Sequence, residues 1–171
     1  HMLHIMNIFK STLYKLANKL DIFQHANKIT NNIWLGNIFS ALDNDFIIKN
    51  NIKVIINCTH NIPFTNLSNI TKYRIGINDK YDINEFMKMS VYLEKITNII
   101  KMYENKNINI LIHCMAGAQR SATILAGFLI KYYKFSTKNA IKYIHNKRTL
   151  AFFPHITFKI VLQNFEQKQK S

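Results

Sequence analysis

The chain has 171 residues, of which 48% are hydrophobic, four are glycine and two are proline. That length suits one domain with a substantial core, and the low glycine and proline content excludes a low-complexity linker. The formal net charge is +14, which favours anionic partners such as phosphopeptides, nucleic acid or anionic lipid. No apolar stretch approaches the roughly 20 residues that a membrane span needs, so we expect none.

The N-terminal segment is expected to form an amphipathic helix. Its apolar residues recur at alternating spacings of three and four, which places them on one helix face: Met6, Phe9, Leu13, Leu16, Leu20 and Phe23. We therefore divide the chain into an N-terminal helix over residues 1–26 and a main domain over residues 27–171. The helix fits two arrangements equally, packing on its own domain or forming a homodimer with a second copy.

The main domain alternates between strand and helix patterns. Strands are expected over residues 28–30, 33–35, 52–58, 72–77 and 108–113, with Gly36-Asn37 as a turn. Helices are expected over residues 39–49, 83–104, 121–133, 137–147 (capped by Thr137) and about 157–167. This alternation predicts an α/β fold with a mainly parallel central sheet flanked by helices. Ligands bind at the carboxyl ends of the strands in such sheets.

Residues 113–122 carry the chemistry, because Cys114 and Arg120 bracket a short loop between a strand and a helix. The loop backbone can wrap a phosphate with its N–H groups, and the helix N-terminus adds a positive field. In that field Cys114 is expected to be a thiolate nucleophile, while Arg120 grips two phosphate oxygens. The phosphate-binding residues are then Met115, Ala116, Gly117, Ala118, Gln119 and Arg120. No metal or cofactor is needed, because the loop itself neutralises the phosphate.

A thiol mechanism also needs an acid for the leaving group and support for the departing sulfur. Asp79 follows a strand at the same sheet edge and is the expected general acid; Asp82 is the rival on the same loop and is interpreted as a solvated residue. Ser121 can donate a hydrogen bond to sulfur, and His113 can orient the loop through its ring nitrogens.

The run His113-Cys114-x-x-Gly117-x-x-Arg120-Ser121 resembles the signature of cysteine-based dual-specificity protein phosphatases. The resemblance extends over about residues 29–166. It rests further on Ile33-Trp34-Leu35-Gly36-Asn37 with Ala41, on residues 52–59, on Ile77-Asn78-Asp79 with Ile83 and Phe86, and on Arg148, Pro154, Phe158 and Leu162. Three positions depart from the family pattern: His155 stands where Asn is usual, Thr157 where Gly is frequent, and Gln119 where Ser or Asn is usual.

The resemblance implies a protein-tyrosine-phosphatase-like fold of the dual-specificity type. It also implies a phosphatase that hydrolyses phosphotyrosine and phosphoserine or phosphothreonine in protein substrates through a phosphocysteine intermediate. Poxvirus members of the family are similar in size and carry an extra N-terminal helix used in dimerisation. We accordingly expect a reducing, cytoplasmic location or, for a viral protein, the host cytoplasm or the virion.

Two other functions compete with this interpretation. The same loop could serve an RNA 5′-phosphatase or a phosphoinositide phosphatase, which the basic charge supports. The interior loop residues Met115, Ala116, Ala118 and Gln119 are uncharged, however, whereas such relatives often carry Lys or a second His there. The third function is a non-catalytic phosphate-binding module, but such proteins usually lack the Cys or the Arg.

Two further features are weaker. Cys58 is interpreted as a buried strand residue, with a reversible disulfide to oxidised Cys114 as the alternative. Lys138, Lys142, Lys147 and Arg148 form the densest basic cluster, which is a weak indication of nucleic-acid binding.

Overall fold

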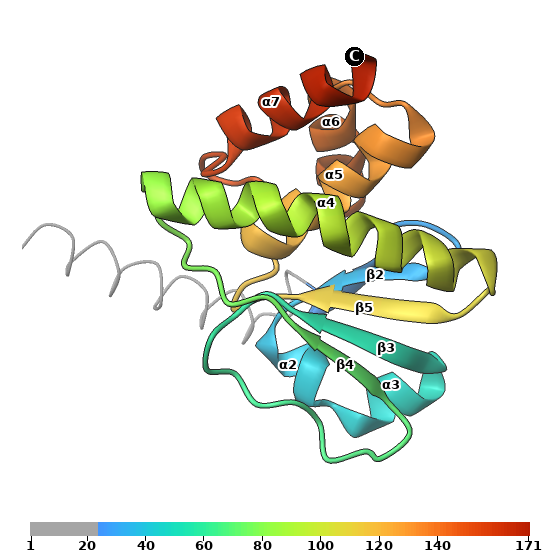
Figure 1. Ribbon diagram of the computed structural model, residues 1–171. Coiled ribbons are helices and arrows are strands. Elements are labelled where there is room, and N and C mark those ends of the chain that lie inside the picture. Colours follow the sequence, from blue (N-terminus) through green and yellow to red (C-terminus); the bar gives the residue numbers. More distant parts are fainter. Residues whose placement is uncertain (1–23) are drawn as a thin grey trace, which may run out of the picture.

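A computed structural model describes residues 24–171 (Figure 1). The expected N-terminal helix over residues 1–26, and with it the homodimer, therefore lies almost wholly outside the described residues and stays a prediction. Its last three residues are described and are not helical, because strand β1 begins at Ala26.

A five-stranded sheet with the order β1-β2-β5-β3-β4 forms the centre of the domain. All neighbouring strands are parallel except β1 and β2, which are antiparallel, so the prediction of a mainly parallel sheet is confirmed. The strands are β1 (Ala26–Lys28), β2 (Ile33–Gly36), β3 (Ile52–Asn57), β4 (Thr71–Arg74) and β5 (Asn109–His113).

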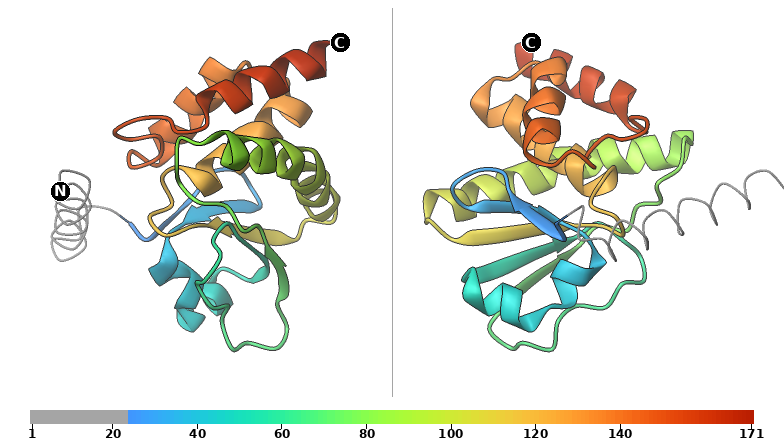
Figure 2. Two further views of the ribbon diagram at one scale, coloured as in Figure 1. Left: turned by 60° about the vertical axis from the view of Figure 1, so that its left-hand side comes forward. Right: turned by 180° about the vertical axis from the view of Figure 1, so that it is seen from behind.

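Helices cover both faces of this sheet, as Figures 1 and 2 show. On one face lie α4 (Ile83–Asn105), α5 (Arg120–Tyr133), α6 (Thr137–Lys147) and α7 (Lys159–Lys170); on the other lie α2 (Ile38–Leu42) and α3 (Asn44–Lys49). Each face has its own apolar core. Along β5, Ile110 and Ile112 join the larger core under α4 and α5, while Leu111 between them joins the smaller core near α3. This alternation follows from the two-residue period of a strand.

Two helix predictions need correction. The helix expected over residues 39–49 is two helices, because Asp43 has an extended backbone and its carboxylate accepts a 3.0 Å hydrogen bond from Phe46 N. Asp43 thus ends α2 and caps α3. The cap of α6 is Ser136 rather than Thr137, since Ser136 Oγ accepts from Asn139 N at 3.1 Å.

The remaining boundaries differ by a few residues. The strand expected over residues 28–30 lies at Ala26–Lys28, and the strand expected over residues 72–77 ends at Arg74. The Gly36-Asn37 pair closes β2 and opens α2, where Asn37 Oδ1 accepts from Ser40 N at 3.1 Å.

Candidate active site

Strand β5 occupies the centre of the sheet, and Cys114 follows its last residue at the carboxyl end. Residues 114–119 connect β5 to α5, and Arg120 is the first residue of α5 (Figure 1). We call residues 114–120, which include Arg120, the 114–120 loop. Its position matches the rule that parallel α/β sheets bind ligands beyond the carboxyl ends of their strands.

A buried arginine from outside the loop holds its backbone. Arg148 donates from Nε to the carbonyl of Gly117 at 2.9 Å and from Nη2 to that of Ala116 at 3.0 Å. Its Nη1 donates to Gln24 O and to Asn27 Oδ1, both at 2.8 Å. The guanidinium therefore ties the loop to Gln24, which precedes β1, and to Asn27 within β1. Arg148 was counted in the basic cluster that gave a weak indication of nucleic-acid binding, but its side chain is buried and bonds to the loop.

Two more loop carbonyls are also hydrogen-bonded from outside. Met115 O accepts from Ile38 N at 3.0 Å, and Ala118 O accepts from Phe152 N at 2.8 Å. In a trans peptide the carbonyl and the following N–H point in opposite directions. With its carbonyls turned outward, the loop turns the intervening N–H groups inward, toward the position of an anion.

Gly117 is required at the middle of the loop. Its φ is +66°, and a Cβ at this position would lie 2.4 Å from Gly36 O and 2.9 Å from Arg148 Nη2. Any side chain would combine backbone strain with a clash against the adjacent strand end.

The sulfur of Cys114 sits at the base of the loop, 3.1 Å from Ser121 Oγ. Burial alone raises the pKa of this thiol, but the charge of Arg120, the hydroxyl and N–H of Ser121 and the N–H of Ala118 together outweigh burial and lower the pKa below its ordinary value. These are the groups that favour a thiolate.

Arg120 faces the same space from the far end of the loop. Its Nη1 donates to Ile77 O at 3.1 Å, while its Nε is buried and has no partner within residues 24–171. That unpaired donor is available for a phosphate oxygen.

The two candidate acids, Asp79 and Asp82, differ in their exposure and in their hydrogen bonds. Asp79 is exposed and lies two residues after Ile77, and its Oδ1 accepts from Thr157 Oγ1 at 2.7 Å. Asp82 is instead the N-cap of α4, because its Oδ1 accepts from Asn84 N at 2.9 Å and Glu85 N at 3.3 Å. Asp82 is thus a half-buried helix cap rather than the solvated loop residue we expected, whereas Asp79 caps no helix and is exposed.

The family follows from a match to known sequences. The family model described as dual specificity phosphatase, catalytic domain, matches residues 33–168. The chain belongs to the dual-specificity phosphatase family. The resemblance inferred from residues 113–121 and the prediction of a phosphatase are confirmed.

Viral proteins are among its relatives. A protein of Acanthamoeba polyphaga mimivirus named for tyrosine-protein phosphatase activity is 29% identical, covering 84% of this chain and 85% of that protein. A similarly named protein of Invertebrate iridescent virus 6 is 31% identical, covering 82% of this chain and 91% of that protein. The crystal structure of human DUSP28 has the same fold, with a TM-score of 0.78 at 17% identity, covering 86% of this chain and 97% of that one.

In this dual-specificity phosphatase, His113 is a buried neutral residue behind the nucleophile. Burial lowers its pKa to about 4, and the charges of Arg74 and Arg120 act in the same direction. Its Nδ1 lies 3.2 Å from Cys114 O, so the neutral ring can donate to that carbonyl. The structure therefore places one ring nitrogen on the loop backbone, while Nε2 has no partner among the described residues.

Glu85 holds the segment that carries Asp79, a role the sequence did not reveal. Its buried carboxylate accepts from Asn78 N at 2.8 Å and from Asn78 Nδ2 at 3.3 Å, and it pairs with Lys88 at 3.0 Å. Burial raises the pKa of Glu85, but these partners lower it overall, so the residue is ionised at neutral pH. The only sequence signal was a carboxylate in the first turn of α4, which is also a common helix-capping pattern.

Gln119 connects the loop to the segment before α7. Its Oε1 accepts from Thr157 N at 3.1 Å, and its Nε2 donates to the carbonyls of His155 and, at 3.5 Å, Phe153. Gln119 was expected to bind phosphate through its backbone, and its side chain has this additional structural use.

Cys58 lies in the core directly after β3, and neither it nor Cys114 forms a disulfide. Burial, together with the proximity of Cys114, raises the pKa of Cys58 well above its ordinary value despite an opposing effect of Arg120. The two thiols therefore differ strongly in their tendency to ionise.

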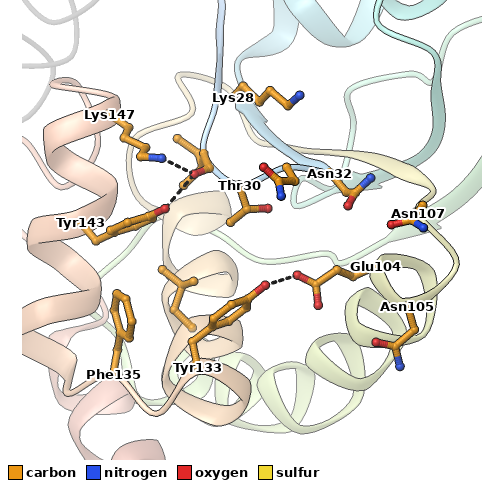
Figure 3. Close-up of a pocket in the computed structure, with 13 residues that line it drawn as sticks. Lys28, Thr30, Asn32, Glu104, Asn105, Asn107, Tyr133, Phe135, Tyr143 and Lys147 are labelled. Carbon is orange, nitrogen blue, oxygen red and sulfur yellow. Dashed lines mark hydrogen bonds between the residues drawn. The ribbon is translucent and has the colours of Figure 1, made fainter.

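A cavity of about 680 Å³ lies at the opposite end of the sheet (Figure 3). Asn31, Asn32 and Asn107, which precede β2 and β5, help to line it. Lys147 and Tyr143 point to one backbone carbonyl there, that of Ile29, at 2.9 Å and 3.2 Å.

Within the described part of the chain, no group of three or more His, Cys, Asp or Glu side chains is arranged to hold a metal ion. No helix in that part is long and apolar enough to cross a membrane.

Proposed function

We propose that this protein removes phosphate from tyrosine, serine and threonine side chains of proteins through a phosphocysteine intermediate on Cys114. The observation that carries the proposal is the 114–120 loop itself. Its carbonyls are paired outward, its N–H groups face inward, and it surrounds a thiol whose pKa is lowered. Such a loop stabilises the charge on the three equatorial oxygens of a phosphoryl group during transfer.

In the first step the Cys114 thiolate attacks phosphorus while the bond from phosphorus to the leaving oxygen breaks. Asp79 gives its proton to that oxygen, so an alcohol or phenol departs. Arg120 and the loop N–H groups hold the transferred phosphoryl group on sulfur.

In the second step a water molecule attacks phosphorus and the bond from sulfur to phosphorus breaks. Asp79, now a carboxylate, takes a proton from that water, and inorganic phosphate is released. The Ser121 hydroxyl, 3.1 Å from the sulfur, donates a hydrogen bond to the departing thiolate.

Protein substrates are supported by the uncharged side chains of residues 115–119. A cationic side chain at these positions would favour a polyanionic substrate such as a phosphoinositide or an RNA 5′-end, and none is present. The family match, described as dual specificity, supports a site that accepts both aryl and alkyl phosphate esters.

Hydrolysis of 4-nitrophenyl phosphate with a chelator present, together with panels of phosphopeptides, phosphoinositides and RNA 5′-phosphates, tests this function. We expect Cys114→Ser to lower kcat by about 10⁴-fold or more and Asp79→Asn by about 10²-fold. Phosphopeptides should give the highest kcat/KM among the panels. A protein that binds phosphate but turns over no substrate would overturn the proposal, and preference for lipid or RNA would redirect it.

A further inference from the structure

The proposed general acid has one side-chain partner in the described part of the chain, and it comes from a distant segment. Thr157 Oγ1 lies 2.7 Å from Asp79 Oδ1, although 78 positions separate the two residues. Asp79 itself is exposed, whereas Thr157 is only 5% exposed. An exposed carboxylate is therefore hydrogen-bonded to a buried hydroxyl.

Gln119 of the 114–120 loop binds the backbone of Thr157. Its N–H donates to Gln119 Oε1 at 3.1 Å, and the Nε2 of the same amide donates to His155 O. Both ends of the Gln119 amide are thus used, which sets its orientation, and Gln119 is itself buried. The connection runs from the loop through Gln119 to Thr157 and from there to Asp79.

These are positions at which the chain departs from its family pattern. Serine and asparagine at position 119 have shorter side chains than glutamine, and glycine at position 157 has no hydroxyl. The hydrogen bond to Asp79 therefore depends on the threonine side chain that this sequence has at position 157.

The hydrogen bond from Thr157 to Asp79 is compatible with proton transfer in both steps. A hydroxyl that donates to Oδ1 leaves Oδ2 free to carry the proton toward the leaving oxygen. Oδ1 can accept from Thr157 whether Asp79 is protonated or ionised, so the bond persists when the acid becomes a base. General acids act over about 2.6–3.2 Å, and a misplacement of about 1 Å can cost about 10²-fold in rate.

We propose that Thr157 is a positioning residue for Asp79 and that Gln119 fixes Thr157 relative to the 114–120 loop. This inference rests on the proposed function and deepens it. Acid catalysis matters most for leaving groups that depart poorly as anions. The connection should therefore be needed most for alkyl phosphates such as phosphoserine and phosphothreonine, less for phenyl phosphate, and least for 4-nitrophenyl phosphate.

The test compares kcat/KM in the full chain on two aryl esters that differ only by a para-nitro group, phenyl phosphate and 4-nitrophenyl phosphate. We expect Thr157→Val to lower kcat/KM on phenyl phosphate by about tenfold and on 4-nitrophenyl phosphate by less than about twofold. Thr157→Ser, which keeps the hydroxyl, should have the wild-type ratio of kcat/KM on phenyl phosphate to kcat/KM on 4-nitrophenyl phosphate. In an Asp79→Asn background, Thr157→Val should change neither substrate further, because the two residues act as one unit.

Thr137 provides a matched control. It is 4% exposed, and its Oγ1 also donates to a carboxylate, that of Glu166, at 2.7 Å. Thr137→Val removes an equivalent bond away from the catalytic loop, so it should leave the ratio of the two substrates unchanged. If Thr157→Val does not fold, Thr157→Ala takes its place, since it introduces no new bulk.

Equal losses on both substrates, or a further loss in the Asp79→Asn background, would show a merely structural role and overturn the inference. The proposed function has a separate failure. If Asp79→Asn itself shows no dependence on the leaving group, the acid assignment is wrong whatever Thr157 does.

Discussion

The two ends of the central sheet differ in the polar groups that they leave unpaired. At the carboxyl end, the carbonyls of the 114–120 loop are paired outward, and Arg120 Nε has no partner among residues 24–171. At the amino end, a cavity of about 680 Å³ is present, but its Lys147 ammonium and Tyr143 hydroxyl both donate to Ile29 O. The amino end also has a buried polar atom without a partner among the described residues, Thr30 Oγ1. The reactive end is therefore marked by the kind of unpaired group, a cationic Arg120 donor near a thiol whose pKa is lowered, and not by cavity volume.

Two consecutive residues illustrate this division. Lys147 is the last residue of α6 and Arg148 is its C-cap; both belong to the basic cluster in the sequence, and only Arg148 also matches the family pattern. In the structure Lys147 bonds at the amino end, whereas Arg148 holds the loop at the carboxyl end. If the two ends are as separate as these contacts indicate, substitutions at the carboxyl end should lower activity, and substitutions at the amino end should not.

Gly117→Ala should have the largest effect, because it changes the loop backbone itself. The added Cβ would lie 2.4 Å from Gly36 O at a φ of +66°, so the loop must shift. After this shift its N–H groups no longer point toward one anion position. We expect kcat/KM on 4-nitrophenyl phosphate to fall by about 10²-fold or more. A fall of less than about threefold in a folded protein, verified by circular dichroism, would show that the loop tolerates another shape.

Arg148→Lys should follow, with a loss of about tenfold or more in kcat/KM and a lower Tm. A single ammonium cannot reproduce the fork that bonds Gly117 O and Ala116 O at once. The matched control is Lys147→Met, which removes the neighbouring cation at the other end. Its kcat/KM should stay within about twofold of wild type, and equal losses in the two variants would contradict the separation of the two ends.

The cysteines should differ in how their alkylation depends on pH. Because the pKa of Cys114 is lowered, iodoacetate should modify it below the pH range of an ordinary thiol. Cys58, buried with a raised pKa, should stay unmodified until the protein unfolds. Arg120→Ala should move the alkylation midpoint of Cys114 to higher pH, as read by mass spectrometry. An unchanged midpoint would show that Arg120 does not supply the stabilising charge.

Glu166→Gln should have the smallest effect, because Glu166 lies at neither end. Lys170 and Thr137 lower the pKa of Glu166 to about 2. The unfolded value is about 4.3, so the ionised carboxylate stabilises the fold above that pH and loses this contribution as pH falls toward about 2. The variant should have a lower Tm at neutral pH, and the difference should shrink as the pH falls through that window. A constant difference across this range would contradict the linkage.

The regular parts of the fold could be predicted because each has a strong local signal. The β-branched runs indicated β3 and β5, and the long amphipathic pattern indicated α4 to within one residue at its C-terminal end. The break at Asp43 was missed because capping depends on a backbone conformation that an apolar pattern does not report. The short β1 has the sequence Ala-Asn-Lys and carries no strand signal of its own.

The candidate site, like the fold, could be predicted only in part from the sequence. Cys114 and Arg120 belong to one short segment, and their spacing alone proposes a loop that wraps an anion. Arg148 and Thr157 meet that loop and Asp79 across separations of 31 to 78 positions. No periodicity in a single sequence indicates which distant polar residues pair, so these contacts required the structure.

The position of β5 also affects how the chain is made. Strand β5 pairs with β2 on one side and β3 on the other, yet both of those strands are synthesised well before it. Until residues 109–113 leave the ribosome, β2 and β3 cannot meet their shared neighbour, and each keeps an open edge that invites pairing with another chain. The strand that precedes the nucleophile is therefore also the strand that joins β1-β2 to β3-β4 in one sheet. The 114–120 loop follows β5 directly in the chain, so it is made only after the strand that covers the open edges of β2 and β3.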